Sequence, residues 1–141
     1  MISAILLAAG QSKRMINENK LIKKYKNIPL IKHSVSNALN SSIDELLIVL
    51  GYQKEVIEKI IEENKKIKFI TNPNFESGIA SSIKKGLDSL SKETEAFFIC
   101  LGDMPNVNKE IYNQLINASF SNKDKEIFVP YYQERQANPI L

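Results

Sequence analysis

The feature that most constrains the fold is a regular alternation of short apolar runs with segments of helical periodicity. Five apolar runs are typical of buried strands, at residues 2–8, 45–50, 67–71, 96–101 and 127–130. Between them, apolar residues recur at the spacing of one helix face, at residues 31–39, 56–61, 79–90 and 111–118. This order predicts a three-layer α/β/α fold, with a mostly parallel central sheet covered by helices on both faces.

In such a fold, the segments that follow the strands come together. Right-handed crossovers bring the carboxyl ends of parallel strands to one edge of the sheet, where ligands bind. We therefore expect one site to be built from the segments that follow the predicted strands: residues 9–19, 51–53, 72–78, 102–106 and 131–138. The run AFFICL at residues 96–101 is the most apolar, which favours a central position in the sheet.

Size and composition exclude several classes of protein. The 141 residues suit one domain, and a net charge of +3 is too small to favour nucleic acid or a membrane surface as partner. A single cysteine excludes an internal disulfide framework and any multi-cysteine zinc site. No apolar run approaches the roughly 20 residues that span a bilayer, and the opening residues do not resemble a signal peptide. We expect a cytoplasmic protein.

The first candidate segment is LAAGQSKRM at residues 7–15, followed by NKL at 19–21. Successive backbone N–H groups after a strand can bind an anion, and Arg14 and Lys20 can neutralise phosphate oxygens. Arg14 is one of only two arginines in the chain. The segment is neither a Walker loop nor a GxGxxG motif. The alternative is a polar surface loop with solvated charges.

The second candidate is Asp103, which directly follows the most apolar strand. A carboxylate at that edge can hold Mg²⁺, which takes one or two carboxylates together with substrate phosphates and waters. The alternative is that Asp103 organises the turn before the next helix. Asn106 and Asn108 are better placed to cap that helix, so the metal interpretation is favoured.

Two further segments have both a functional and a structural interpretation. Residues 72–82 run through a turn into a helix amino terminus, where polar ligands are favoured, although Ser77 can equally serve as the helix cap. Residues 130–139 would either place Arg135 at the edge where the carboxyl ends of the strands meet, or form a hairpin-like turn with exposed tyrosines. His33 lacks a partner for metal or triad chemistry, and we expect Cys100 to be an inert core thiol.

Taken together and in order, the motifs resemble a known family. LAAGQSKRM, NKL, PLIKH, NPNFESGIASS, LGDMP, VPYY and R-x-x-NP resemble the MobA-like NTP transferases, and among them the molybdenum cofactor cytidylyltransferases. The resemblance implies a Rossmann-like nucleotidyltransferase fold. It also implies Mg²⁺-dependent transfer of a nucleoside monophosphate from an NTP to a phosphorylated acceptor such as molybdopterin, with release of pyrophosphate. By this comparison, residues 1–141 form a single nucleotidyltransferase domain that lacks the family's C-terminal part.

The resemblance also implies roles for the nucleotide loop. Ala8, Ala9, Gly10 and Ser12 would line the nucleotide. Alanine at position 9, together with the GDMP motif, favours CTP over GTP. Ile16 departs from the family pattern, which has glycine at that position.

The remaining roles fall on charged and small residues. Arg14 and Lys20 would hold the triphosphate and the leaving pyrophosphate, and Asp103 would hold Mg²⁺. Gly78 and Ser82 would lie near the base or the ribose. Two alternatives stay open: a guanylyltransferase or sugar-phosphate nucleotidyltransferase, and a non-catalytic nucleotide-binding protein that assists molybdoenzyme maturation. The resemblance therefore implies an NTP and a small phosphorylated acceptor as partners, with a molybdoenzyme as a further one.

Overall fold

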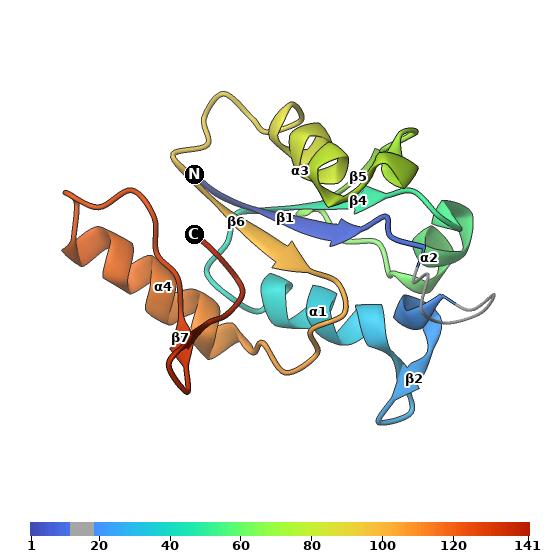
Figure 1. Ribbon diagram of the computed structural model, residues 1–141, viewed down its shortest axis with the longest axis horizontal. Coiled ribbons are helices and arrows are strands. Elements are labelled where there is room, and N and C mark those ends of the chain that lie inside the picture. Colours follow the sequence, from blue (N-terminus) through green and yellow to red (C-terminus); the bar gives the residue numbers. More distant parts are fainter. Residues whose placement is uncertain (12–18) are drawn as a thin grey trace.

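A four-stranded parallel sheet forms the centre of the computed structural model, which describes residues 1–11 and 19–141 (Figure 1). The strand order is β5-β4-β1-β6. The strands are β1 (Ile2–Ala8), β4 (Glu45–Leu50), β5 (Ile67–Thr71) and β6 (Ala96–Leu101). Each has the bounds predicted from its apolar run. The chain adds β4 and β5 on one side of β1 and then returns to place β6 on the other, which creates a switch in strand order beside β1.

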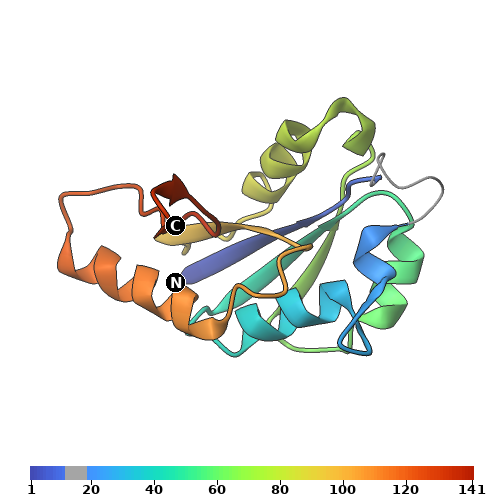
Figure 2. The ribbon, with the colours of Figure 1, turned by 60° about the horizontal axis from the view of Figure 1, so that its bottom comes forward.

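Helices cover both faces of the sheet, as the three-layer prediction requires (Figure 2). The helices are α1 (Leu30–Leu39), α2 (Lys54–Ile60), α3 (Ile79–Leu87) and α4 (Lys109–Ser121). Side chains of β1 point alternately to the two faces of the sheet. Leu6 belongs to the larger core cluster, which includes Ile31 of α1, Ile57 of α2 and Leu115 of α4. Ile5 packs in a second cluster on the face covered by α3.

Several short elements complete the fold. They are the 3₁₀ turns η1 (Lys20–Ile22) and η2 (Phe75–Ser77) and the two-residue strands β2 (Lys24–Tyr25), β3 (Ile28–Pro29), β7 (Tyr131–Tyr132) and β8 (Arg135–Gln136). β2 pairs with β3 and β7 with β8, each as an antiparallel hairpin. No helix in the described part of the chain is long and apolar enough to cross a bilayer.

The prediction that residues 96–101 form the central strand is wrong. β6 lies at one end of the four-stranded sheet, and β1 and β4 are the inner strands. β6 is apolar because both of its faces are covered: Phe98 faces the larger core cluster, and Phe97 faces the smaller one. Its outer edge is partly paired, since Ile99 and Ile140 exchange two backbone hydrogen bonds of 2.8 and 3.2 Å.

The predicted fifth strand at residues 127–130 is also wrong. Phe128 instead exchanges backbone hydrogen bonds with Leu141, at 2.8 and 3.1 Å, so this segment pairs with a later part of the chain rather than joining the sheet. The β7–β8 hairpin lies between these partners, and its tyrosines are exposed. The hairpin alternative for residues 130–139 is therefore confirmed.

Cys100 is a core residue, as expected, and its chemistry follows from its position. It is 2% exposed, and burial raises the pKa of its thiol to about 12 despite a hydrogen bond with Tyr112. The reactive thiolate is thus suppressed near neutral pH. We expect iodoacetamide to label Cys100 in denaturant but scarcely at all in the native protein at about pH 8, as measured by mass spectrometry. Native labelling at the rate of a free cysteine would contradict this packing.

Candidate functional site

A cavity of about 470 Å³ opens at the carboxyl edge of the sheet, beside the switch in strand order. Its walls come from the ends of β1 and β6, from η1 and from the η2–α3 segment. The residues carried over from the family pattern that line it are Ala8, Ala9, Gly10, Lys20, Gly78, Ser82 and Asp103. Ser12 and Arg14 lie outside the described residues. The topology thus brings together residues that are far apart in the sequence.

One wall of the cavity carries an ion pair between Lys20 and Asp103. Lys20 Nζ lies 3.0 Å from Asp103 Oδ2, and the two side chains are 50% and 39% exposed. Lys20 opens η1, which is capped by the buried Asn19: its Oδ1 accepts a hydrogen bond of 3.0 Å from the Leu21 N–H. Because a solvent-exposed ion pair contributes little net free energy, both groups can exchange this partner for a ligand.

Asp103 is held at the cavity by the backbone around it. The Gly102 N–H donates to the carbonyl of Leu7 (3.0 Å), which ties the residue after β6 to the end of β1. Helix α1 also holds this loop by two hydrogen bonds. Ser34 Oγ donates to the Gly102 carbonyl (2.9 Å), and Asn37 Nδ2 donates to the Pro105 carbonyl (3.0 Å).

The cap of α4 leaves Asp103 available for other interactions. Asn108 Oδ1 accepts a hydrogen bond of 3.2 Å from the Ile111 N–H, so Asn108 caps this helix as expected. Asp103 is therefore not needed to start α4, which was the alternative role predicted for it. Its carboxylate faces Lys20 and the cavity instead.

Glycine at position 102 lies in a closely packed part of the fold. A Cβ there would lie 2.9 Å from Ile31 Cδ1 and 3.1 Å from the Leu7 carbonyl oxygen. We expect Gly102→Ala to lower the free energy of unfolding by about 1–3 kcal/mol, because such overpacking forces the backbone to shift. Gly10→Ala is the control, since its Cβ would meet no atom within 4 Å. Equal denaturation midpoints for the two variants would contradict this account.

The opposite wall depends on Asn72, whose role was not predicted from the sequence. Asn72 is 3% exposed, and its Nδ2 donates to Ser81 Oγ (2.9 Å) and to Ser82 Oγ (3.0 Å). Its Oδ1 accepts from the Asn74 N–H at 3.0 Å, an Asx turn. Asn72 thereby joins the end of β5 to the first turns of α3. The Asn-Pro-Asn sequence of this turn was the available signal.

Ser77 does not cap α3, so that sequence alternative is wrong. Its Oγ donates to the Asn74 carbonyl at 2.8 Å, and α3 begins after Gly78 without a side-chain cap. Gly78 has φ of 112°, a conformation that glycine adopts most easily. A Cβ there would meet nothing within 4 Å, so the cavity is open at this position.

A hydrogen bond joins two walls of the cavity, from the segment after β1 to the segment after β5, two strands between which β4 lies in the sheet. Gln11 Nε2 donates to Glu76 Oε1 at 2.9 Å, and both residues line the cavity. Gln11 follows β1, whereas Glu76 lies in η2 after β5. Residues separated by 65 positions carry no common local pattern, so this pair was not predicted from the sequence.

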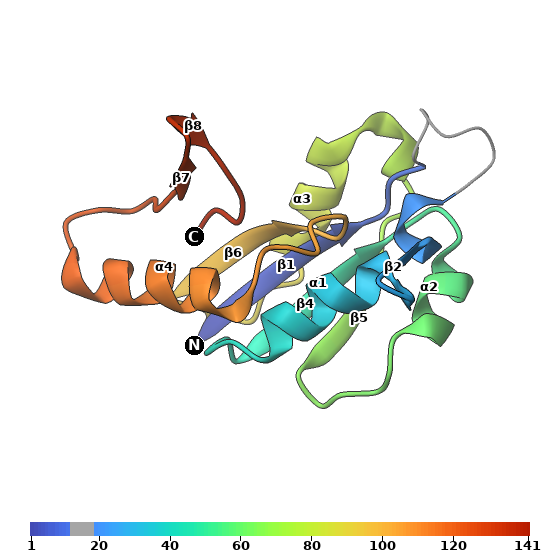
Figure 3. The ribbon, with the colours of Figure 1, turned by 90° about the horizontal axis from the view of Figure 1, so that it is seen from below.

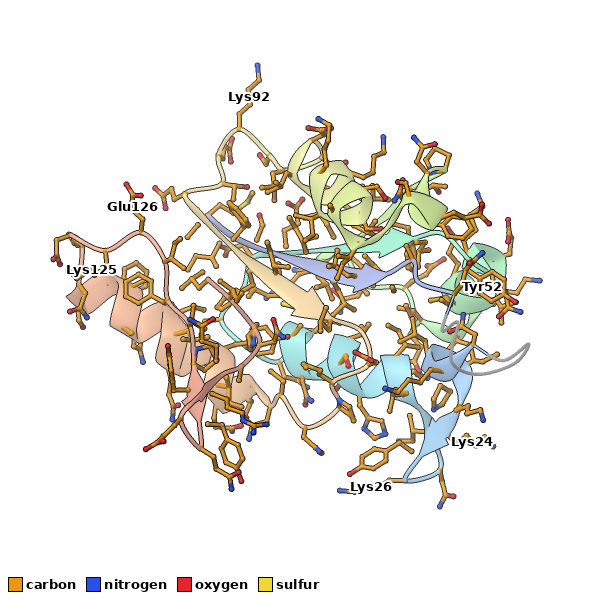
Figure 4. All side chains as sticks on the ribbon, in the orientation of Figure 1. Lys24, Lys26, Tyr52, Lys92, Lys125 and Glu126 are labelled. Carbon is orange, nitrogen blue, oxygen red and sulfur yellow. The ribbon has the colours of Figure 1, made fainter. Side chains whose placement is uncertain are left out.

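The prediction that residues 131–138 help to form the site is wrong. None of these residues lines the cavity, and the ribbon views place the β7–β8 hairpin at the other end of the molecule (Figures 1 and 3). In Figure 4, the neighbouring Lys125 and Glu126 likewise lie far from Tyr52, which follows β4 at the carboxyl edge. The reason is that residues 127–130 do not form a parallel strand. Residues 131–138 therefore do not follow a strand that ends at the carboxyl edge.

The donor set determines what kind of metal site is possible. Among residues 1–11 and 19–141, no three His, Cys, Asp or Glu side chains gather closely enough to hold a metal ion. Asp103 offers one carboxylate on a cavity wall. This fits Mg²⁺ bound partly by substrate phosphates and water, rather than by an all-protein cage. His33 takes no part, because its Nε2 donates to the Tyr25 carbonyl at 2.7 Å.

The fold and the cavity define an α/β protein whose site lies where such sheets bind nucleotides and other ligands. The chain belongs to the MobA-like NTP transferase family, whose domain model matches residues 4–141. It is 28% identical over 142 residues to a probable molybdenum cofactor guanylyltransferase of Methanosarcina mazei, covering 98% of this chain and 61% of that protein. It is 26% identical over 140 residues to the molybdenum cofactor cytidylyltransferase of Escherichia coli, covering 99% and 69%.

Solved structures agree on the fold. Rv0371c of Mycobacterium tuberculosis matches with a TM-score of 0.84 at 20% identity, over 99% of this chain and 69% of that one. A complex of Rv0371c with manganese matches with a TM-score of 0.78 at 19% identity, over 99% and 68%. The chain thus spans about two-thirds of the length of these related proteins.

Proposed function

We propose that this chain is the nucleotide-binding part of a nucleotidyltransferase that moves a nucleoside monophosphate from an NTP to a phosphorylated acceptor. The observation that carries the proposal is the cavity in which Lys20 and Asp103 face each other at the carboxyl edge of the sheet. A cation and a carboxylate in one open cavity suit a magnesium–triphosphate ligand, which has an anionic and a cationic part.

The reaction needs no protein nucleophile. A phosphate oxygen of the acceptor, already ionised, attacks the α-phosphorus of the NTP as the bond to the β-phosphate breaks, and pyrophosphate leaves with that electron pair. Negative charge grows on the α-phosphoryl oxygens and on the pyrophosphate. Lys20 would neutralise that charge, together with Arg14. The backbone of Ala8, Ala9 and Gly10, with Ser12, would position the nucleotide.

Asp103 would hold a divalent cation, with Mg²⁺ as the expected ion. When bound, such an ion supplies charge stabilisation to the transferring phosphoryl group and orients the triphosphate. The related Rv0371c has been solved with manganese, which supports a divalent ion. Gly78 and Ser82, on the wall opposite Asp103, would lie near the base or ribose.

CTP is the favoured donor and molybdopterin the favoured acceptor. Alanine at position 9 and the GDMP motif favour CTP, and the Escherichia coli relative is a molybdenum cofactor cytidylyltransferase. A guanylyltransferase is the second candidate, since the Methanosarcina mazei relative is described as one. A non-catalytic nucleotide-binding accessory protein is the third. In each case we propose a cytoplasmic protein, with a molybdoenzyme as the final recipient of the cofactor.

Two measurements separate these candidates. The four NTPs are compared for Mg²⁺-dependent thermal stabilisation of this chain, and pyrophosphate release is then measured with the protein containing this chain at full length. We expect CTP to stabilise most and to release pyrophosphate when molybdopterin is supplied. Greatest stabilisation by GTP would support the guanylyltransferase, and nucleotide binding without pyrophosphate release the accessory protein. No stabilisation by any NTP would contradict the proposal.

A further inference from the structure

The Gln11–Glu76 hydrogen bond lies at a defined place relative to the ion pair. The strand order β5-β4-β1-β6 sets the order of the segments along the carboxyl edge. Asp103 follows β6 at one end, Gln11 follows β1 in the middle, and Glu76 follows β5 at the other end. Gln11 and Glu76 line the same cavity as Lys20 and Asp103, so a nucleotide that fills this cavity with its phosphates at Lys20 and Asp103 would extend its base toward Gln11 and Glu76.

The surfaces near Glu76 suit a planar ring. Ile79 lines the cavity yet is 60% exposed, and Phe75 lines it as well. Such apolar side chains can cover the face of a base. A Cβ at Gly10 or Gly78 would meet no atom within 4 Å, so the space between the walls is open. Glu76 then offers the charged group beside the place where the base edge would lie.

We propose that Glu76, oriented by Gln11, reads the base and selects nucleotides that carry an exocyclic amino group at its Watson–Crick edge. This inference rests on the proposed nucleotidyltransferase function. The bond from Gln11 occupies one acceptor position of a carboxylate that has about four. The remaining positions accept a hydrogen bond from the 4-amino group of cytosine. In uracil, the 4-oxo oxygen would instead face a carboxylate oxygen, and two acceptors repel each other.

CTP and UTP form the matched pair of probes, because they have the same size and differ in this donor and acceptor pattern. We expect the wild-type chain with Mg²⁺ to bind CTP about tenfold more tightly than UTP, as expected for one charge-assisted hydrogen bond. Calorimetric titration measures both dissociation constants. In Glu76→Gln, the amide can present either a donor or an acceptor, so the ratio of the two constants should fall close to one.

Two further variants separate base reading from general effects. Gln11→Leu removes the group that orients Glu76, and the CTP-to-UTP ratio should fall partway. Glu110→Gln, which changes an exposed carboxylate on α4 that does not line the cavity, should leave the ratio unchanged.

The outcomes distinguish this inference from the function on which it rests. Equal wild-type affinities for CTP and UTP, or a preference that Glu76→Gln retains, would overturn base reading by Glu76 while leaving nucleotide binding in place. Binding of neither nucleotide, at any Mg²⁺ concentration, would overturn the proposed function and the inference with it.

Discussion

Asp103→Asn is expected to abolish metal-dependent nucleotide binding and to lower turnover at least about a hundredfold. The substitution keeps the shape of the side chain and removes its charge, so a divalent cation loses the one carboxylate that this cavity wall offers beside Lys20. Isothermal titration with CTP, with and without Mg²⁺, measures the first effect. Pyrophosphate release by the full-length protein measures the second.

The fold should survive this substitution. Asp103 is 39% exposed, and its ion pair with Lys20 contributes about 1 kcal/mol at most to stability. Thermal denaturation should therefore show a nearly unchanged midpoint. Asp88→Asn, at the end of α3 and outside the cavity, serves as the matched control and should bind CTP and Mg²⁺ normally. Unchanged metal-dependent binding by Asp103→Asn would show that the metal lies elsewhere.

Lys20→Met is expected to have opposite effects on the two ligands. Without nucleotide, Lys20 holds the same carboxylate that a cation needs, so its removal should strengthen binding of the metal alone up to about fivefold. With nucleotide, the variant lacks a cation for the phosphates, and its CTP affinity should fall about tenfold or more. The stem of Met keeps most of the apolar volume of the lysine.

The same geometry predicts coupling between the ligands. In the wild type, phosphates that attract Lys20 release Asp103 for the cation, so nucleotide and metal should each strengthen binding of the other by an equal factor. Titrations of Mn²⁺ followed by electron paramagnetic resonance, at zero and saturating CTP, measure this factor. It should shrink in Lys20→Met and persist in Lys84→Met, a control on the exposed face of α3. Weaker binding of the metal alone to Lys20→Met would contradict competition for Asp103.

Local patterns were sufficient to predict most of the fold. The inner strands β1 and β4 are almost entirely apolar because they are buried on both faces, and their runs end sharply at turn residues. β5, at one edge of the sheet, is partly exposed and includes Lys68, yet its bounds were also predicted. The order of the strands also predicted that the segments 9–19, 51–53, 72–78 and 102–106 meet at one edge. Of these segments, the described residues that line the cavity are Ala9, Gly10, Gln11, Phe75, Glu76, Gly78 and Asp103, whereas none of residues 51–53 does. The position of Asp103 at this edge follows from that topology.

The errors came from pairings that no local pattern encodes. The apolar character of β6 reflects coverage of its two faces, which does not distinguish an inner strand from an outer one whose edge is partly paired by Ile140. Residues 127–130 have strand propensity, but the backbone pairing of Phe128 with Leu141 directs them away from the sheet. For the same reason, the contact between Gln11 and Glu76 could not be predicted without the strand order.

The most direct test is a crystal structure of the protein with CTP and Mg²⁺. We predict a triphosphate that contacts Lys20, a metal ion on Asp103 and a base that extends along the carboxyl edge toward Glu76. Nucleotide density outside this cavity, or a bound nucleotide with Lys20 and Asp103 still paired to each other, would contradict the account.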